Sequence, residues 1–571
     1  MRTPSRRSAL LPAVVLGALF SLGLLAQRAT DTAPADLLIL NGKVYSVDVF
    51  HEAIAIRGNT IVEVGRSRDL ERLRGPRTEV IDARGGAVVP GFNDSHVHFL
   101  SGGLALADVD LSGITSLREV QDKIRAFAQT KPGQPLVRGR GWLYSAFPGG
   151  LPTRQQLDEV EPDRPAVMTA YDGHTTWVNS KALQAAGITS ATADPPNGII
   201  VKDSKTGEPT GVLKEAAQSL MNRVVPRPTA DDQRRALRAA VAEANRLGVT
   251  SIQNASGSAE EFTIYADARR AGDLKVRTYS ALSISPGFTD ADADRFDAVR
   301  TLYGDDPVFR TGIVKIVADG VIESRTAGML APYAGATTAG SPNYSAAELN
   351  RIVALMDRRG WQIEIHAIGD RTVRMTLDAF ERAIATNPAP LRGRRHRIEH
   401  IETIDAADIP RFGSLGVIAS QQPMHVVLGD MNSLKPSGPW PDNLGAERAS
   451  RAWNWKSIRD AGGRITFGSD WAVAPLDPLQ GILVVTTRLT PPGMKDQKLP
   501  MTQAVDGYTA WPAYASFDEH RKGTLVPGLL ADVVVLSRDL FAQPLLNATD
   551  AIVDTTIYDG HVVYRRQEGR R

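Results

Sequence analysis

The sequence predicts an α/β protein: a TIM-type (β/α)8 barrel, a β-sandwich domain built from both chain ends, and an insertion subdomain after the first barrel strand. Apolar β-type runs alternate with helical segments through the middle of the chain, and short strands bounded by turn residues occupy both ends. Eight such runs can be counted in the middle, which is the number of parallel strands that closes a barrel.

The composition is that of a large globular protein without cysteine. The chain has 571 residues, 66 Lys+Arg against 64 Asp+Glu, and no Cys. The near-balanced charge argues against a dedicated nucleic-acid binder. Without cysteine, disulfides, thiolate nucleophiles and sulfur-ligated metal sites are excluded, so any metal must be held by nitrogen and oxygen. The 10 histidines are therefore the residues to examine.

Residues 1–35 resemble an export signal. Arg2, Arg6 and Arg7 precede an apolar run at 9–26, and residues 33–35 offer a small-x-small cleavage pattern. The arginine pair is similar to a twin-arginine signal, although the usual aromatic residue after it is missing; export would place the protein in the periplasm or outside the cell. The apolar run is also long enough to span a bilayer, so the alternative is an uncleaved N-terminal membrane anchor.

The two chain ends are expected to build one β-sandwich. Short β-type runs at 37–40, 43–45, 53–56 and 61–64 alternate with turn residues in the segment 36–89, and similar runs at 523–536 and 554–564 follow the last barrel helix in the segment 511–571. Neither segment has enough strands to close a core by itself, so the two are expected to pair.

Residues 90–510 carry the barrel pattern. In one unit, Ser345 and Glu348 form a capping box for a helix ending at Arg359, Gly360 is its αL stop, and a strand follows. The eight strand runs are the one ending at His98 and those at 249–254, 276–282, 313–317, 362–366, 396–400, 417–420 and 465–467. Residues from about 100 to 228 do not fit this count and are expected to form the insertion, long enough for a lid.

The first strand run carries His96 and His98. Alternate residues of a strand share one face, so both imidazoles are expected to point into the barrel, where they would suit a divalent metal. Taken alone, the pair fits two incidental histidines equally well. However, His366, His400 and Asp470 end three later strands, and the carboxyl ends of the strands build the catalytic face of a barrel. The sequence therefore predicts a metal cluster at this rim.

Lys315 interrupts the apolar run of the fourth strand, where a bare ammonium inside a barrel would be costly. One explanation is a salt bridge with Asp319 or Glu323. The other, which we favour, is that CO₂ carboxylates the amine to a carbamate, an anion able to bridge two metals.

Together these residues resemble the amidohydrolase superfamily of metal-dependent hydrolases. The patterns Pro90-Gly91-Phe92, Asp172-Gly173-His174, Asp319-Gly320, His366-Ala367-Ile368-Gly369-Asp370 and Gly468-Ser469-Asp470 are similar to its amidohydrolase 3 branch, the YtcJ-like proteins that include N-substituted formamide deformylase. The likeness covers about residues 35–564. Residues of the insertion, such as Trp177-Val178-Asn179-Ser180, also fit that branch.

The resemblance implies a ligand set. His96 and His98 would hold one metal, His366 and His400 the other, and carboxylated Lys315 would bridge them. One or two divalent ions are expected, zinc first, with manganese or iron as alternatives. Asp470 would be a further ligand and the proton carrier.

His174 lies in the insertion and is expected to reach the scissile bond from above the metals; the alternative is a loop histidine packed on aromatic residues. Trp142, Trp177, Arg325 and Gln422 are expected to contact substrate. Among the remaining histidines, only His425 follows a strand closely enough to border the pocket, and none has a partner at ligand spacing. The turn with Arg392, Arg394 and Arg395 is expected to stay solvated.

We therefore expect a metal-dependent hydrolase that cleaves a non-peptide carbon–nitrogen bond of an amide or formamide, with Asp470 as proton shuttle. The alternatives are hydrolysis of a cyclic amide, an N-acyl amino acid or an ester in the same site, or a catalytically silent metal-binding protein. The expected partner is a small molecule and not a nucleic acid, and a membrane is contacted only through an uncleaved N-terminal segment. Barrels of this kind often pair, so a homodimer is one expected state.

Overall fold

The computed structural model describes residues 33–428, 434–490, 493–542, 547 and 550–567. The export signal or anchor predicted at the N-terminus falls almost entirely outside these residues. Among the helices described, none combines the length and apolarity needed to cross a membrane.

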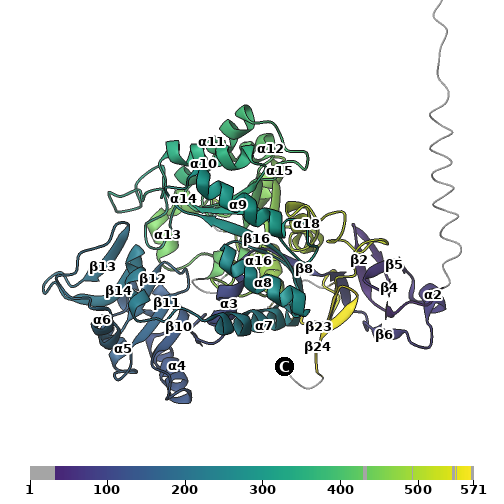
Figure 1. Ribbon diagram of the computed structural model, residues 1–571, viewed down its shortest axis with the longest axis horizontal. Helices are drawn as coiled ribbons and strands as arrows, with labels where there is room; N and C mark the ends of the chain where they lie inside the picture. The colour runs from purple at the N-terminus through teal and green to yellow at the C-terminus, as the bar shows by residue number, and fades with distance from the viewer. Residues whose placement is uncertain (1–32, 429–433, 491–492, 543–546, 548–549, 568–571) are drawn as a thin grey trace, which may run out of the picture.

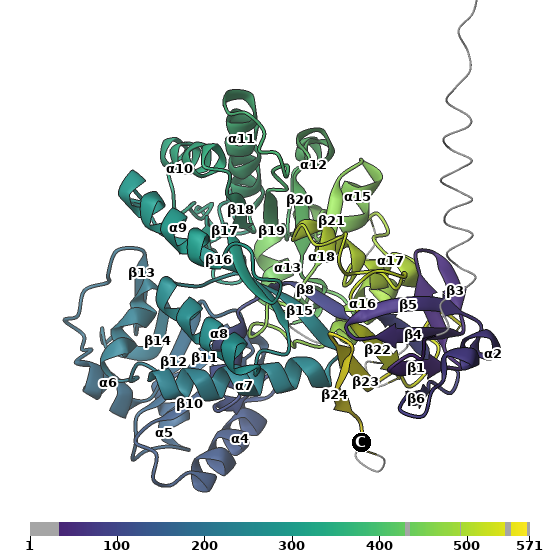
Figure 2. The same ribbon diagram turned by 45° about the vertical axis from the view of Figure 1, so that its right-hand side comes forward.

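The centre of the molecule is an eight-stranded parallel sheet in which each strand pairs with the next along the chain (Figures 1 and 2). The strands are β8 (Phe92–Val97), β15 (Val249–Asn254), β16 (Arg277–Ile284), β17 (Phe309–Val317), β18 (Gln362–Ala367), β19 (Arg397–His400), β20 (Ile418–Gln421) and β21 (Arg464–Phe467). All eight correspond to predicted runs, with ends that differ by a few residues.

The first and last strands come together just past their ends. The backbone N–H of Asp470 donates to the carbonyl oxygen of His96 at 2.7 Å, and the N–H of His98 donates to Trp471 at 2.5 Å. A parallel bridge also joins Val97 to Trp471. The sheet is thus a nearly closed barrel, and the predicted fold class is confirmed.

Helices surround the outside of the barrel (Figure 2). They include α7 (Ala230–Arg246), α8 (Ala259–Ala271), α9 (Asp290–Tyr303), α10 (Ala346–Arg358), α11 (Asp370–Thr386), α12 (Ile409–Leu415) and α15 (Trp455–Asp460). The helix α10 begins as predicted, since the Ser345 hydroxyl accepts the N–H of Glu348, and Gly360 adopts φ +74° just after its end. All six residues of β18 are buried, as expected for a parallel strand covered by helices.

Both chain ends contribute to a pair of sheets beside the barrel. One sheet has the order β5 (Thr60–Gly65), β4 (Ala53–Arg57), β1 (Leu37–Leu40), β6 (Glu79–Asp82); the other has β24 (His561–Arg565), β23 (Val553–Tyr558), β22 (Val533–Leu536), β7 (Ala87–Pro90), β2 (Lys43–Ser46), β3 (Val49–His51). The C-terminal β22 pairs with the N-terminal β7, and Val88 and Val533 share one apolar core. Of the run predicted at 523–536, only 533–536 is a strand.

The insertion carries a six-stranded sheet of its own. Its order is β13 (Gly198–Lys202), β14 (Pro209–Glu215), β12 (Thr175–Val178), β11 (Ala166–Ala170), β10 (Val137–Trp142), β9 (Val109–Asp110), with α4 (Leu117–Thr130), α5 (Arg154–Asp158) and α6 (Ser180–Ala186) packed on it. Separate apolar cores on this sheet support the insertion as a subdomain. The exact domain boundaries stay predictions.

Candidate metal centre

The barrel places the six predicted ligands at one end. His96 lies at the end of β8 and His98 directly follows it, Lys315 lies near the end of β17, and His366 and His400 lie at the ends of β18 and β19. Asp470 follows β21 by three residues. These side chains are buried except for that of His98, which is 30% exposed. Carboxyl ends of parallel strands converge, so residues far apart in the chain meet.

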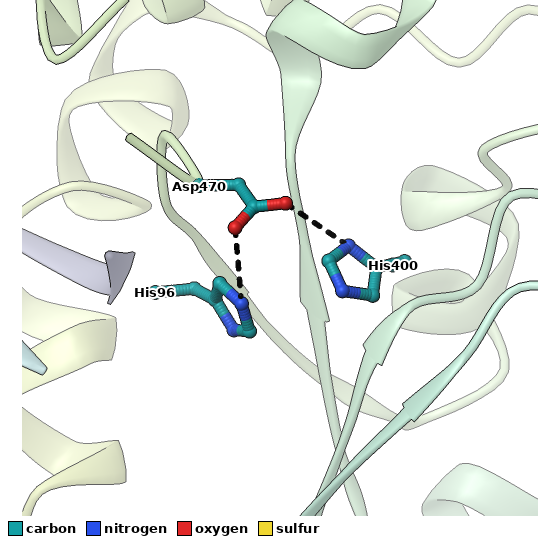
Figure 3. A group of neighbouring side chains, drawn as sticks. All are labelled: His96, His400 and Asp470. Atoms are coloured by element: carbon teal, nitrogen blue, oxygen red, sulfur yellow. Dashed lines mark ion pairs between the residues drawn. The ribbon is translucent and has the colours of Figure 1, made fainter. Parts of the chain in front are cut away.

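The carboxylate of Asp470 faces both His96 and His400 (Figure 3). Its carboxylate oxygen Oδ1 is 3.4 Å from His96 Nε2 and 3.0 Å from His98 Nε2. The other oxygen, Oδ2, is 3.9 Å from His400 Nδ1. One ligand atom from each of His96, His400 and Asp470 lies within 4.8 Å of the others, a spacing that a single cation can bridge.

The remaining two ligands adjoin the same group. Lys315 Nζ is 3.4 Å from His96 Nε2, and the rings of His366 and His400 are 4.4 Å apart. Among the described residues Lys315 makes no ion pair with Asp319 or Glu323, so the salt bridge considered from the sequence is not formed.

Outer contacts fix the orientation of three imidazoles. His96 Nδ1 donates to Glu399 at 2.6 Å, and His98 Nδ1 lies 2.8 Å from the Ser256 hydroxyl. His366 Nε2 donates to the carbonyl oxygen of Gly320 at 3.2 Å. Metal-binding histidines commonly use one nitrogen this way and leave the other as the ligand.

A buried polar atom without a hydrogen-bond partner among the described residues also marks this centre. It is His400 Nδ1, in a side chain less than a tenth exposed. A buried acceptor without a partner is costly, and a divalent cation would satisfy it. The nitrogen and oxygen donors present therefore fit a metal of the zinc type.

The charge states of His366, His400 and Asp470 favour metal binding. Burial and the positive charge of Lys315 hold the pKa of His366 well below its usual range, and burial does the same for His400. Burial alone would raise the pKa of Asp470, but His96 and the neighbouring imidazoles lower it far below its ordinary value. Neutral imidazoles and an ionised carboxylate are the forms that bind cations.

Asp94 ties the loop of Asp470 to β8. Its Oδ1 accepts the backbone N–H of His96 and that of Ser469, each at 3.0 Å. A Cβ on the intervening Gly468 would lie 2.5 Å from the His96 nitrogen, so this approach requires glycine. His400 and Asp470 have φ of 74° and 59°, and such strained backbone is typical of functional sites.

Asp319 likewise joins two segments of the site, the loop after β17 and the end of β18. Its carboxylate accepts three backbone N–H groups, those of Gly328, Ile368 and Gly369, at 3.0 to 3.1 Å. These bonds hold the loop after β17 against the end of β18, which carries His366. The Asp319-Gly320 and Ile368-Gly369 patterns of the sequence thus have a structural reason.

A cavity of about 270 Å³ opens at this end of the barrel, with Asp470 and His400 in its lining. Its other lining residues are His98, Tyr171, Asp172, Gly173, His174, Lys315, Val317, Val321, Glu323, His366, Ile368, Glu402, His425, Leu428 and Val473. The insertion supplies the segment 171–174, so it covers part of the barrel mouth.

His174 lines the cavity, as the sequence led us to expect. Its Nδ1 donates to Glu215 at 2.8 Å, and its ring lies 6.3 Å from that of His366. Burial opposes a charge on His174, but Glu215 outweighs it and raises its pKa to about 9. A cationic imidazole is therefore held over the metal-ligand group.

His425 is a site residue that the sequence did not identify beyond its position near the pocket. Its Nδ1 lies 3.1 Å from Glu402, and its Nε2 lies 3.5 Å from Asp470. Glu402 also accepts the indole N–H of Trp440 at 2.6 Å. The short helix η6 (Pro423–Val427) after β20 brings His425 there, and a histidine closely following a barrel strand was the signal available.

The proposed substrate contacts require correction. Trp142 and Trp177 are fully buried in the core of the insertion, and their indole N–H groups donate to the carbonyls of Met168 and Thr153. Arg325 is exposed and donates to Asn443. Gln422 is buried, and like the other three it does not line the cavity.

The basic turn after α11, with Arg392, Arg394 and Arg395, forms ion pairs with neighbouring segments. Arg394 donates to Asp357 at 2.7 Å. Arg395 makes bonds of 2.9 and 2.7 Å to Glu519 and stacks over Tyr514. The predicted solvated turn is therefore wrong, because these ion pairs hold it to the barrel.

Comparisons with known proteins agree with this architecture. Residues 79–564 match the model described as the amidohydrolase family. The chain is 32% identical over 550 residues to the protein LONG AFTER FAR-RED 3 of Arabidopsis thaliana, covering 92% of this chain and 91% of that protein. It is 27% identical over 555 residues to N-substituted formamide deformylase of Arthrobacter pascens, covering 94% and 99%.

A solved structure also resembles the chain. An uncharacterized metal-dependent hydrolase from Pyrococcus furiosus has a TM-score of 0.66 and 25% identity, covering 88% of this chain and 99% of that one. The family match over most of the chain, together with relatives matched over nine-tenths or more of both chains, shows that this protein is a hydrolase belonging to the amidohydrolase family.

Proposed function

We propose that this protein hydrolyses the carbon–nitrogen bond of a small non-peptide amide, of which an N-substituted formamide is the leading example. The observation that carries the proposal is the convergence of ligand atoms from His96, His400 and Asp470 within 4.8 Å at the floor of a cavity. The resemblance to N-substituted formamide deformylase over nearly the full length of both chains supports the choice of bond.

His96, His98, His366, His400, Asp470 and carboxylated Lys315 would hold one or two divalent ions, zinc first. Such ions lower the pKa of water from about 15.7 toward about 7 and polarise carbonyl groups. His96, His98 and His366 each use one ring nitrogen in a contact with another residue of the protein. These contacts would keep the rings oriented, as hydrogen bonds to metal ligands commonly do.

Asp470 would carry the proton. It is ionised in the free site, so it can accept a proton from the attacking water as that water adds to the carbonyl carbon. When the carbon–nitrogen bond breaks, Asp470 would return the proton to the departing nitrogen, giving a carboxylic acid and an amine. General acid–base transfer of this kind is worth about 10²- to 10⁴-fold in rate.

His174 would stabilise negative charge that develops on the substrate. Because its ring is cationic and lines the cavity, it can donate to an oxygen that gains negative charge during the addition of water. Glu215 fixes the ring for that task, and the hydroxyls of Ser324 and Thr326 fix Glu215.

The test begins with the metal content of the purified protein. Wild type and Asp470→Asn, each loaded with zinc, manganese or iron, are then screened against N-alkyl formamides, N-acyl amino acids, hydantoins and aryl esters. We expect formamide turnover by wild type and a loss of at least about 100-fold in the variant, with metal retained. An equal rate in the variant would contradict the role of Asp470.

The screen also separates the alternatives. Selective turnover of hydantoins, N-acyl amino acids or esters would move the substrate assignment within the same site. A protein that binds none of the three metals, and gains no activity when they are added, would support the catalytically silent alternative. Mass spectrometry of the intact protein under ¹³C-bicarbonate tests the carbamate on Lys315.

A further inference from the structure

Three carboxyl groups line the cavity besides that of Asp470. They belong to Asp172, Glu323 and Glu402, which follow β11, β17 and β19. None of them is a proposed metal ligand. Among the described residues His400 Nδ1 has no hydrogen-bond partner, although its side chain is more than nine-tenths buried, so the cavity is built to receive a ligand.

Two of these carboxyl groups are well supplied with donors. Asp172 accepts the Tyr144 hydroxyl and the backbone N–H of His174, each at 2.9 Å. Glu402 lies 3.1 Å from the cationic ring of His425 and accepts the indole of Trp440. Each of these two carboxyl groups therefore has two polar partners within the protein.

Glu323 differs from both. The Tyr171 hydroxyl donates to its Oε1, and within the described part of the chain no Lys, Arg or His forms an ion pair with it. Burial and the nearby negative charges of Glu402 and Asp172 raise its pKa to about 8. A partly buried carboxylate without a cationic partner is costly, and a positive group of a ligand would supply that partner.

The cavity is lined by groups of both charges and by apolar side chains. Lys315, the metal-ligand imidazoles and the cationic ring of His174 line it together with the carboxyl groups, and Val317, Val321 and Leu428 line it as well. With about 270 Å³, the cavity is near the small end of ligand pockets, which begin at about 300 Å³. A short aliphatic chain with an amide at one end and a cation at the other would reach both the metal-ligand group and Glu323.

We propose that the cavity selects amides that carry a protonated amino group on a short alkyl chain, and that Glu323 receives this group. The inference rests on the proposed hydrolysis at the floor of the same cavity. Glu323 would act as a specificity determinant, because it contacts the substrate away from the bond that breaks.

The test is a matched series of formamides of equal chain length. N-formyl-1,4-diaminobutane carries the cation, N-formylpentylamine replaces the ammonium with methyl, and 5-(formylamino)pentanoate places a carboxylate nearby. For wild type we expect kcat/KM at least 10-fold higher for the cation than for the neutral compound, and lowest for the anion. Glu323→Gln should lower the value for the cation about 10-fold and change the neutral one less than 3-fold.

Tyr171→Phe is the control variant. It removes the hydroxyl that donates to Glu323 but leaves the carboxyl group. If Glu323 only fastens the insertion to the barrel, both variants will slow all three formamides alike, and the inference is overturned. Retention of the cation preference in Tyr171→Phe, with its loss in Glu323→Gln, supports substrate recognition.

Binding of hydroxamates to the metal-loaded protein tests the inference without turnover. We expect 6-aminohexanohydroxamic acid to bind at least 10-fold more tightly than heptanohydroxamic acid, and Glu323→Gln to remove the difference. A preference in binding without hydrolysis of any formamide would refute the proposed function and leave the cation site standing. Hydrolysis without any preference would refute the cation site alone, and failure of both hydroxamates to bind would contradict both.

Discussion

The Nε2 atom of His425 lies 3.5 Å from a carboxylate oxygen of Asp470, although the two residues follow different barrel strands. The ring of His425 also lies nearly parallel to that of His400, with centroids 5.6 Å apart and 15° between the planes. Burial alone would lower the pKa of His425, but Asp470 and Glu402 raise it to about 10. Asp470 is therefore flanked by a fixed cation on the side away from His98.

Replacement of His425 by Asn should reduce activity without emptying the metal site. The variant loses the cation that orients Asp470, and loss of such outer partners commonly costs about 10- to 100-fold in activity. We expect kcat to fall within that range while the metal content of the purified protein stays at the wild-type value. His520→Asn is the matched control, since that side chain is 90% exposed. Equal effects of both variants would exclude a positioning role for His425.

Asp94→Ala should destabilise the protein. The wild-type carboxylate accepts backbone N–H groups of His96 and Ser469, and alanine has no side-chain acceptor for either. Leaving buried donors unpaired costs about 1–3 kcal/mol each, so the free energy of unfolding in urea should fall by at least about 1 kcal/mol. Asp122→Ala, which removes a surface ion pair, should change it by less than about 0.5 kcal/mol. An unchanged midpoint for Asp94→Ala would contradict this role.

Removal of bound metal should lower the melting temperature as well as the activity. His400 Nδ1, which has no hydrogen-bond partner among the described residues, loses the cation as its partner when the metal leaves. A ligand present at about 1,000 times its Kd stabilises the folded state by about 4 kcal/mol. We expect a chelator to lower the melting temperature, zinc or manganese to restore it, and His366→Ala to weaken the restoration. A protein whose melting is indifferent to both treatments would argue against a resident metal.

The pH dependence of stability provides a test of Glu323. Its pKa is about 8 in the folded protein against 4.5 for an ordinary glutamate, so the folded state binds more protons between these values. Stability attributable to this group is complete at low pH and declines as the pH rises toward 8. The titratable groups that interact with Glu323 are Tyr171, Asp172, His174 and Glu402, and all four are unchanged in the Gln variant. The melting temperature of Glu323→Gln relative to wild type should therefore rise from pH 5 to pH 8; a constant difference would contradict the raised pKa.

The barrel and its ligand set could be predicted because both depend on short-range pattern. Alternation of apolar strands and capped helices fixes the topology, and parallel topology then brings all strand ends to one rim. His96, His366 and His400 follow from that rule alone. The ends of strands such as β17 could not be predicted as well, since Thr311 and Gly312 interrupt its apolar run while pairing decides its length.

The wall of the cavity could not be predicted in the same way. Glu323 and His425 lie in segments after strands, whose paths depend on contacts with the insertion and with Trp440. Trp177 was expected to contact substrate because it is only three residues from His174. In β12, however, its side chain is buried in the core of the insertion rather than in the cavity lining. Proximity in sequence says little about which face a strand residue occupies.

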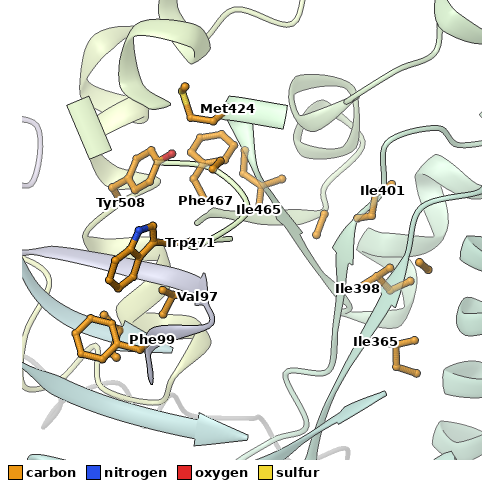
Figure 4. Packing of buried hydrophobic residues seen from close by; sticks show 14 of the residues in the cluster. Val97, Phe99, Ile365, Ile398, Ile401, Met424, Ile465, Phe467, Trp471 and Tyr508 are labelled. Atoms are coloured by element: carbon orange, nitrogen blue, oxygen red, sulfur yellow. The ribbon is translucent and has the colours of Figure 1, made fainter. Parts of the chain in front are cut away.

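At Gly102, helix propensity and side-chain packing have opposite effects on stability. It lies inside the helix α3 (Phe99–Ala105) after β8, and in a free helix Gly→Ala stabilises by about 1 kcal/mol. A Cβ at this position would, however, lie 2.3 Å from the ring of Trp471, which follows Asp470 and packs with Val97 and Phe99 (Figure 4). Such overpacking costs about 1–3 kcal/mol, so the clash outweighs the helix propensity.

We therefore expect Gly102→Ala to lower the free energy of unfolding and to weaken metal binding, because a displaced Trp471 moves the neighbouring Asp470. Gly133→Ala is the control, since no heavy atom lies within 4 Å of a Cβ built there. Urea unfolding and metal titration should therefore separate the two variants. A Gly102→Ala protein as stable as wild type, with unchanged metal affinity, would mean that Trp471 can shift without moving Asp470.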